Sequence, residues 1–219
     1  MNALSKQRCL VLDTSSQTTF VGICHEGKWL SLQSSEEPAL ESLFTLLDKA
    51  FEEASLERSA IDSILYCAGP GSTLGVRLAC MTLRAWRSIG LFKDTPIYAY
   101  LSLPLIAAIA ERTHTASSPF YVITELRKNA WNVLTVSSPS TLDTIKEAST
   151  LPDPKGSYFY FPQRRRNPDL PALTTEVAYC IQQLPKVIDK PSLCTPANTP
   201  APWDIKKPTY AKWSAERHR

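Results

Sequence analysis

Short apolar runs alternate with polar turns over the first 35 residues, a pattern typical of neighbouring β-strands. The run Arg8–Asp13 is apolar in its interior and ends on an aspartate, which predicts a buried strand. Two further strands are predicted at Thr19–Cys24 and Trp29–Gln33, and Gly27 supplies the backbone freedom that the turn between them needs. Three consecutive strands joined by short turns predict an antiparallel meander.

From residue 39 onward the spacing of the apolar residues indicates helices that alternate with strands. The predicted elements are helices at Ala39–Ala54, Thr73–Ile89 and Ser102–Arg112, and strands at Ile61–Ala68 and Ile97–Tyr100. Ser72 is a suitable N-cap for the second helix. Three antiparallel strands followed by alternating helices and parallel strands is the order of the ribonuclease-H-like and actin-like ATPase fold. We therefore predict an α/β protein with a mixed sheet.

The second half of the chain has a weaker pattern. Its predicted elements are strands at Phe120–Thr124 and Trp131–Val136 and a helix at Thr174–Leu184. Prolines are dense from Pro152 onward, which leaves room only for short elements separated by long surface loops. We expect two subdomains, an actin-like one at residues 1–115 and a smaller, degenerate one with proline-rich loops at residues 116–219.

The overall composition is that of a globular protein, with 43% hydrophobic and 21% charged residues among 219. The net charge of +3 permits contact with nucleic acid but does not argue for it. The longest apolar stretch, Leu101–Ala110, is much shorter than the roughly 20 residues needed to span a bilayer. No apolar segment of signal-peptide length follows the basic residues near the N-terminus, so we expect the protein in the cytoplasm.

Six cysteines occur, and none stands in a C-x-x-C pair, which excludes zinc-ribbon and thioredoxin-like proteins. Several lie inside apolar runs, so free buried thiols are expected. The three histidines form no metal-binding pair, and neither a nucleophile elbow nor a Cys–His dyad can be identified. The sequence therefore predicts no catalytic residues, no metal site and no resident cofactor.

The first candidate site follows the first strand, at Asp13, Thr14 and Ser15. In actin-like kinases an acidic residue and a hydroxyl-rich hairpin at this place hold magnesium and nucleotide phosphate. The hydroxyls and exposed backbone N–H groups of such a turn suit an oxyanion. The alternative is that these side chains satisfy only the backbone groups of the turn.

The second candidate is the loop Gly69-Pro70-Gly71-Ser72, which opens the second predicted helix. A helix N-terminus preceded by glycine is a general anion site. The loop is not a P-loop, because the lysine of the pattern G-x-x-x-x-G-K-[ST] is absent. A purely structural tight turn is the alternative.

The second predicted helix carries Arg77, Arg84 and Arg87 within an arc of about 80°, at about 100° per residue. Apolar residues occupy much of the remaining circumference. A helix with so wide an apolar arc is either enclosed in the core or docked on another chain. The arginines are interpreted as a solvated stripe or, alternatively, as a recognition surface.

Two segments mix aromatic and basic residues, Phe159–Arg166 and Lys206–Trp213. Such mixtures can stack on bases and pair with phosphates in RNA. The alternative is an edge strand followed by a soluble turn.

Three motifs occur in the order found in TsaB (YeaZ) proteins, at Leu10–Ser15, Gly69–Ala79 and Pro208–Trp213. The middle motif is the specific one. Against the family pattern G-P-G-S-F-T-G-V-R-I-G, the matching residues are Gly69, Pro70, Gly71, Ser72, Gly75, Val76 and Arg77. The chain therefore resembles the TsaB family. It departs from the family pattern at Ala39-Leu40, where His-Ser is usual, and around Arg127, the one residue that fits a D-A-R-x-G-E segment well.

The resemblance implies a degenerate actin-like fold that has lost catalysis. TsaB-like proteins partner TsaD, the enzyme that moves a threonylcarbamoyl group onto adenosine 37 of tRNA, together with the ATPase TsaE. It implies a cytoplasmic, non-catalytic subunit that binds a TsaD-like protein and a TsaE-like ATPase and forms a homodimer when alone. Contact with tRNA is expected to be indirect, membranes are not expected as partners, and ATP or ADP is expected only at an interface with a partner.

The resemblance also implies where the sites lie, because the first two helices of the family form its docking surface. The residues expected at this partner interface are Leu40, Leu43, Leu47, Thr73, Leu74, Arg77, Met81 and Arg84. A vestigial phosphate or nucleotide loop is implied at Asp13, Thr14, Ser15, Gly69, Gly71 and Ser72.

Two rival functions fit the sequence less well. An actin-like small-molecule kinase or ATPase would need a second glycine-rich motif for adenosine late in the chain, whereas the last of the seven glycines is Gly156. A peptidase, a label that such sequences attract through their relatives, would need a metal or a nucleophile constellation, and the sequence offers neither.

Overall fold

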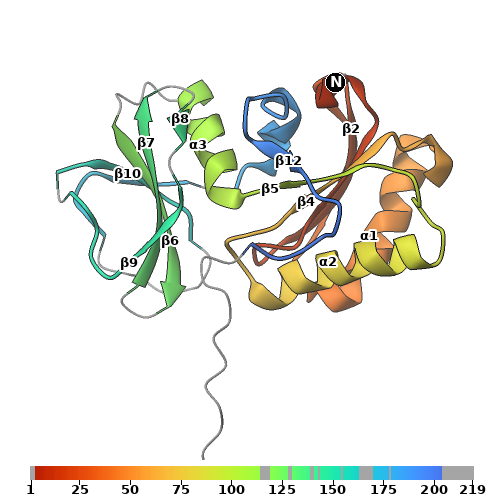
Figure 1. The fold of residues 1–219 in the computed structure, drawn as a ribbon, viewed down its shortest axis with the longest axis horizontal. Helices are drawn as coiled ribbons and strands as arrows, with labels where there is room; N and C mark the ends of the chain where they lie inside the picture. The colour runs from red at the N-terminus through yellow and green to blue at the C-terminus, as the bar shows by residue number, and fades with distance from the viewer. Residues whose placement is uncertain are drawn as a thin grey trace, which may run out of the picture.

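The computed structural model describes residues 3–113, 119–127, 130–138, 141–142, 144–153, 155–162, 170–177 and 179–203. Two six-stranded sheets lie side by side with one helix between them (Figure 1). Three of the predicted features lie outside the described residues, namely the segment Lys206–Trp213, the motif Pro208–Trp213 and the arginines Arg164, Arg165 and Arg166.

The first sheet has the strand order β12-β5-β4-β1-β2-β3. Its strands are β1 (Cys9–Asp13), β2 (Thr19–His25), β3 (Lys28–Ser35), β4 (Ser63–Cys67), β5 (Ile97–Tyr100) and β12 (Cys194–Pro196). The first three form the predicted antiparallel meander, β4 runs parallel to β1, and β5 runs parallel to β4. The predicted mixed sheet is thus confirmed. The sequence did not indicate β12, which comes from the far end of the chain and pairs antiparallel with β5.

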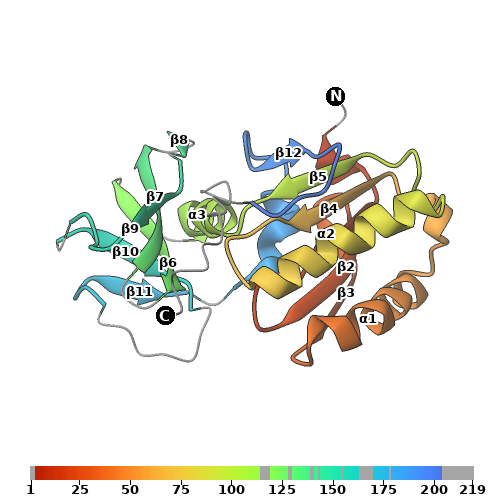
Figure 2. The ribbon, with the colours of Figure 1, turned by 60° about the horizontal axis from the view of Figure 1, so that its bottom comes forward.

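The helices lie on both faces of the first sheet (Figures 1 and 2). They are α1 (Ala39–Ala54), α2 (Thr73–Ser88) and α3 (Ser102–Thr113), with short 3-10 helices η1 (Leu4–Lys6), η2 (Arg58–Ala60) and η3 (Ile181–Lys186). Successive residues of a strand point to opposite faces of a sheet. Leu10 and Leu12 of β1 accordingly pack with α1 and α2, whereas Cys9 and Val11 pack with α3 and η3.

Helix α3 is enclosed because it lies between the two sheets (Figure 2). Leu105 and Ala108 belong to the core that covers the first sheet. Ile106 and Ala110, on the other side of the helix, pack against the second sheet. The apolar side chains of α3 therefore join the two halves of the molecule.

The second sheet has the strand order β11-β10-β6-β7-β8, and β9 also pairs with β7. Its strands are β6 (Phe120–Arg127), β7 (Ala130–Ser138), β8 (Thr141–Leu142), β9 (Lys146–Ala148), β10 (Ser157–Tyr160) and β11 (Thr174–Glu176). The two strands predicted here are confirmed as the antiparallel pair β6 and β7. The predicted helix at Thr174–Leu184 is wrong. Its first residues form β11, parallel to β10, and only a 3-10 turn that contains Pro185 follows.

Residues 197–203, called the return segment here, run along the first sheet after β12. The Tyr66 hydroxyl donates to the Ala201 carbonyl (3.0 Å), and the Trp203 N–H donates to the Ala68 carbonyl (2.8 Å). The Trp203 side chain packs against the cores of both sheets. The C-terminal half thus contributes to both sheets, and the boundary expected near residue 115 stays a prediction.

All six cysteines are free, as predicted. Among the residues that the structure describes, no helix combines the length and the apolar composition that crossing a bilayer requires.

Candidate functional site

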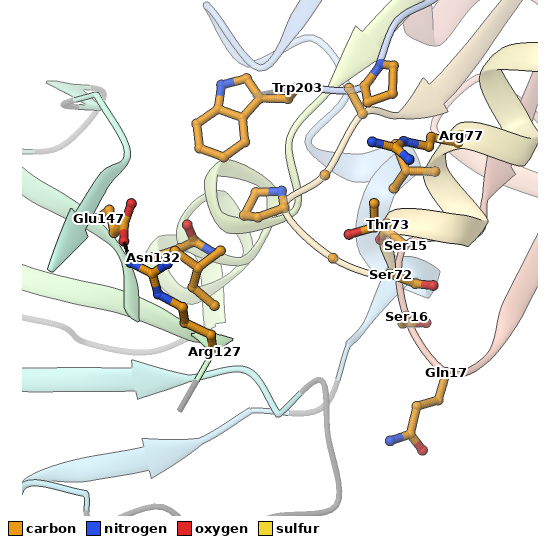
Figure 3. A pocket seen from close by; sticks show the side chains of 17 residues that line it. Ser15, Ser16, Gln17, Ser72, Thr73, Arg77, Arg127, Asn132, Glu147 and Trp203 are labelled. Carbon is orange, nitrogen blue, oxygen red and sulfur yellow. Dashed lines mark hydrogen bonds and ion pairs between the residues drawn. The ribbon is translucent and has the colours of Figure 1, made fainter. Parts of the chain in front are cut away.

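A cavity of about 780 Å³ opens between the two sheets, beside the start of α2. Figure 3 shows its two walls. The labelled residues of the first-sheet wall are Ser15, Ser16, Gln17, Ser72, Thr73 and Arg77. The opposite wall, from the second sheet, presents Arg127, Asn132 and Glu147. The Trp203 indole of the return segment lies between the walls, at the top of the view.

The loop before α2 packs the start of that helix closely against the turn between β1 and β2. Ser72 caps the helix, because its hydroxyl accepts a hydrogen bond from the Gly75 N–H (3.3 Å). A Cβ on Gly71 would lie 2.2 Å from the Ser15 carbonyl oxygen, and one on Gly75 would lie 2.0 Å from the Thr14 carbonyl oxygen. Close backbone packing therefore requires glycine at positions 71 and 75.

Asp13, at the end of β1, is fully buried, and both of its carboxylate oxygens accept hydrogen bonds. Oδ1 accepts from the backbone N–H (2.9 Å) and the hydroxyl (2.7 Å) of Ser15. Oδ2 accepts from the hydroxyls of Tyr100 and Tyr179. Desolvation by burial raises the pKa of Asp13, and these hydrogen bonds offset the rise only in part. Burial and the nearby carboxylate also raise the pKa of both tyrosines, so both hydroxyls stay protonated donors.

Only some of the six residues expected to form a phosphate loop line the cavity. Four of them line the cavity, namely Ser15, Gly69, Gly71 and Ser72. Asp13 and Thr14 do not line it, which corrects the assignment made from the sequence. Their polar atoms are used inside the protein, and the Thr14 hydroxyl donates to the Gly75 carbonyl (2.8 Å). These two side chains therefore have a structural role, in which they satisfy polar groups of the protein itself.

Replacing Asp13 by asparagine is expected to make the free energy of unfolding less dependent on pH. The unfolded chain ionises this carboxyl near its ordinary pKa of 3.8, whereas burial raises the pKa in the folded protein. Between the two pKa values the folded state holds the extra proton, so stability falls as the pH rises, by at most about 1.4 kcal/mol per pH unit. Urea unfolding between about pH 4 and about pH 8 tests this. A difference between wild type and variant that stays constant with pH would contradict it.

The second-sheet wall was not identified from the sequence, apart from the match of Arg127 to the family pattern. Arg127 on β6 forms an ion pair with Glu147 on β9 (2.5 Å). Asn132 on β7 is the register partner of Glu147 and is only 2% exposed. No local pattern indicates that these strands face α2, because their placement depends on the packing of the whole second sheet.

Two of the three arginines of α2 bind the return segment, and the third lines the cavity. Arg84 Nε donates to the Pro200 carbonyl (2.7 Å), and Arg87 donates to the Asn198 carbonyl (2.7 Å). Both side chains thus hold the return segment against α2. Arg77 points into the cavity instead (Figure 3), as does Thr73 at the helix start. Thr73, Arg77 and Arg84 are all exposed, and their assignment to the partner interface stays a prediction.

The apolar residues expected at the partner interface divide into buried and exposed ones. Leu43 and Leu47 of α1 are 0% and 3% exposed and pack in the core of the first sheet. Their assignment to the interface is therefore wrong, because the face of α1 that carries them covers the protein's own sheet. Leu40, Leu74 and Met81 are exposed. Phe44, which was not predicted, is exposed beside them.

The aromatic residues at the start of the segment Phe159–Arg166 are core residues. Phe159, Tyr160 and Phe161 are all buried, and Phe159 packs edge-on against Phe120. Their strand, β10, lies between β6 and β11 and is not an edge strand. Neither the base-stacking interpretation nor the edge-strand interpretation holds for them.

Within the described part of the chain, no three His, Cys, Asp or Glu side chains gather in an arrangement that could hold a metal ion.

The strand order of the first sheet, with helices on both of its faces, defines an α/β protein of the ribonuclease-H-like, actin-like class. Among solved structures, the fold is similar to that of YeaZ from Pseudomonas aeruginosa. That structure is 21% identical with a TM-score of 0.58, over 71% of this chain and 75% of that chain.

A second structure from the same organism, of a protein with similarity to peptidase YeaZ, matches 91% of this chain and 100% of its own. Its identity is 17% and its TM-score is 0.65. The sequence matches no protein-family model and no curated protein. At these identities the likeness establishes the fold, and function has to be argued from the residues.

Proposed function

We propose that this chain is a non-catalytic subunit that binds a TsaD-like protein and supports threonylcarbamoylation of adenosine 37 in tRNA. The fold it has in common with YeaZ and the motif Gly69–Arg77 are consistent with this role. A TsaE-like ATPase joins the same assembly, and ATP or ADP binds at an interface with a partner. Contact with tRNA is made through the partner.

The observation that carries the proposal is an exposed apolar surface on α1 and α2, called the docking face here. Its residues and their exposed fractions are Leu40 (71%), Phe44 (50%), Leu74 (80%) and Met81 (67%). Residues four apart, or seven apart, lie on the same side of a helix, so each pair forms a stripe. The two helices lie side by side (Figures 1 and 2). Exposed apolar surface on neighbouring helices is typical of protein–protein interfaces.

The same face gives the protein a way to bury apolar surface when it is alone. Two copies that cover their docking faces form a homodimer with two-fold symmetry, since the same patch is used on both subunits. A TsaD-like protein that covers the face displaces the second copy.

The environment of Asp13 supports a non-catalytic role. A magnesium-dependent kinase needs a carboxylate that reaches the nucleotide, whereas both Asp13 oxygens are engaged by Ser15 and two tyrosines. A rival kinase activity would require this network to open. Measurable ATP turnover that is abolished by Asp13→Ala would support the kinase.

The test is to mix the protein with the TsaD-like protein of its own organism and to measure the mass by light scattering behind a sizing column. A one-to-one complex is expected. Met81→Glu or Leu74→Glu is expected to weaken it by about tenfold or more, because central apolar contacts each contribute about 2 kcal/mol. The same substitutions are expected to convert a homodimer to a monomer.

The matched control is Leu173→Glu, since Leu173 is also exposed (59%) but lies beside the second sheet, before β11. This variant is expected to bind as the wild type does. The absence of a complex at micromolar concentration, with ATP and the TsaE-like protein present, would overturn the proposal. Equal losses for Leu173→Glu and Met81→Glu would show that binding does not use the docking face.

A further inference from the structure

Charged residues of opposite sign flank the docking face. On α1, Glu41 and Glu52 are exposed and form no ion pair with any residue that the structure describes. α2 contains no acidic residue, and its Arg77 and Arg84 are exposed. The apolar residues of the docking face lie between these two groups.

The acidic residues of α1 lie on its side away from α2. α1 covers β2 and β3, and the Glu53 carboxylate accepts a hydrogen bond from the Gln33 side chain on β3, the edge strand of the first sheet. At about 100° per residue, Glu41 and Glu52 lie between Glu53 and Phe44 around the helix. The order across α1, from the sheet edge inward, is therefore acidic and then apolar.

The basic residues of α2 lie on its side away from α1. Arg84 Nε donates to the Pro200 carbonyl of the return segment, which follows β12 at the opposite edge of the first sheet. Arg77 lies seven residues earlier, on the same side of the helix. Leu74 and Met81 come next around α2 in the direction of α1. The whole face thus changes from acidic through apolar to basic.

The two charged groups also lie at matching heights along their helices. β3 and β4, the strands before α1 and α2, both run parallel to β1, so both helices begin at the same edge of the sheet (Figure 2). At about 1.5 Å per residue, Glu41 and Arg77 lie within about 6 Å of the starts of their helices. Glu52 and Arg84 lie about 15 to 20 Å from the same starts.

We propose that a second copy of the chain binds this face in one orientation, with α1 of each copy against α2 of the other. The inference rests on the docking face of the proposed function and adds the charges by which that face recognises its occupant. A two-fold axis between the helices and parallel to them brings each acidic side onto the basic side of the other copy. Glu41 then faces Arg77 of the other copy, and Glu52 faces Arg84. An axis across the helices would place like charges together.

The first test is the salt dependence of self-association, measured by sedimentation equilibrium of the full chain. The dissociation constant of the dimer is expected to rise about tenfold between about 50 mM and about 500 mM NaCl, because salt screens exposed ion pairs. A constant that falls or stays the same would overturn the arrangement. A chain that stays monomeric throughout would overturn it as well, whereas mixing with the TsaD-like protein decides the proposed function separately.

The second test exchanges one charge pair. Glu41→Lys and Arg77→Glu are each expected to weaken the homodimer by about tenfold, because the two-fold axis repeats the altered pair. Mixed in equal amounts, the two variants are expected to form a mixed dimer of about wild-type affinity, since both pairs again have opposite charges. Native mass spectrometry with one variant labelled with ¹⁵N identifies the mixed dimer. No preference for it over the two homodimers would overturn the proposal.

The matched control is Glu26→Lys, which makes the same change of charge at an exposed position in the turn between β2 and β3. It is expected to change the dissociation constant by less than about twofold and to show no preference for Arg77→Glu. Arg84 is left unchanged because it binds the return segment. Equal losses for Glu26→Lys and Glu41→Lys would show that net charge, and not this pair, controls the dimer, which would overturn the inference.

Discussion

Changing Gly75 to alanine is expected to lower the free energy of unfolding by about 3 kcal/mol, the upper part of the range for overpacking. The added methyl carbon would lie 2.0 Å from the Thr14 carbonyl oxygen. A backbone atom cannot turn away as a side chain can, so α2 has to move off the turn between β1 and β2. Helix propensity alone predicts the opposite sign, a gain of about 1 kcal/mol for this substitution. Urea unfolding followed by circular dichroism measures the difference.

The matched control for this variant is Gly90→Ala, just beyond the end of α2. Its methyl group would have no atom within 4 Å, and the only strain comes from the positive φ of 82°. A cost of about 1 kcal/mol is expected there. If Gly75→Ala were as stable as the wild type, the close approach of α2 to the turn would be contradicted.

Changing Leu43 to glutamate is expected to lower the free energy of unfolding by about 4 kcal/mol, enough to unfold a protein of ordinary stability in part. Leu43 is fully buried between α1 and the first sheet, where a carboxylate has no partner. Its neighbour Leu40 is 71% exposed. Leu40→Glu is expected to change stability by less than about 0.5 kcal/mol, and an acidic residue in the first turn of a helix is favourable.

These two variants of α1 separate the core from the docking face. The same urea titration, with soluble yield as a second readout, measures both. Leu40→Glu should fold and lose partner binding, whereas Leu43→Glu should lose folding itself. A folded and cooperative Leu43→Glu would contradict the orientation of α1.

The elements of the first sheet could be predicted because their signals are local. Alternation in β1 to β3 and the three- and four-residue spacing in α1 come from neighbours in sequence, and the sheet order follows from their succession. The same signals could not separate Leu40 from Leu43 as interface residues. Both are leucines on one amphipathic helix, and only the placement of the sheet decides which of them is covered.

The second half and the cavity depended on contacts between residues distant in sequence. Thr174–Glu176 is too short to show a strand pattern of its own. It becomes strand β11 only by pairing with β10, from which a long connection separates it in the sequence. Asn132 and Glu147 are polar residues that can be recognised as lining the cavity only once their sheet is known to face α2. The sequence pattern predicts Asp13 as a site residue, because it cannot place Tyr100 and Tyr179 around the carboxylate.

The pairing of β12 with β5 affects how the protein is made on the ribosome. The first five strands of the first sheet lie within residues 9–100, but its sixth strand lies at 194–196. The exposed edge of β5 and the groups that bind the return segment therefore wait while about a hundred more residues are synthesised, for several seconds at about 5–20 residues per second. An unpaired strand edge is a template for aggregation during that time. Synthesis of this chain thus has a vulnerable interval that ends only when its last described residues emerge.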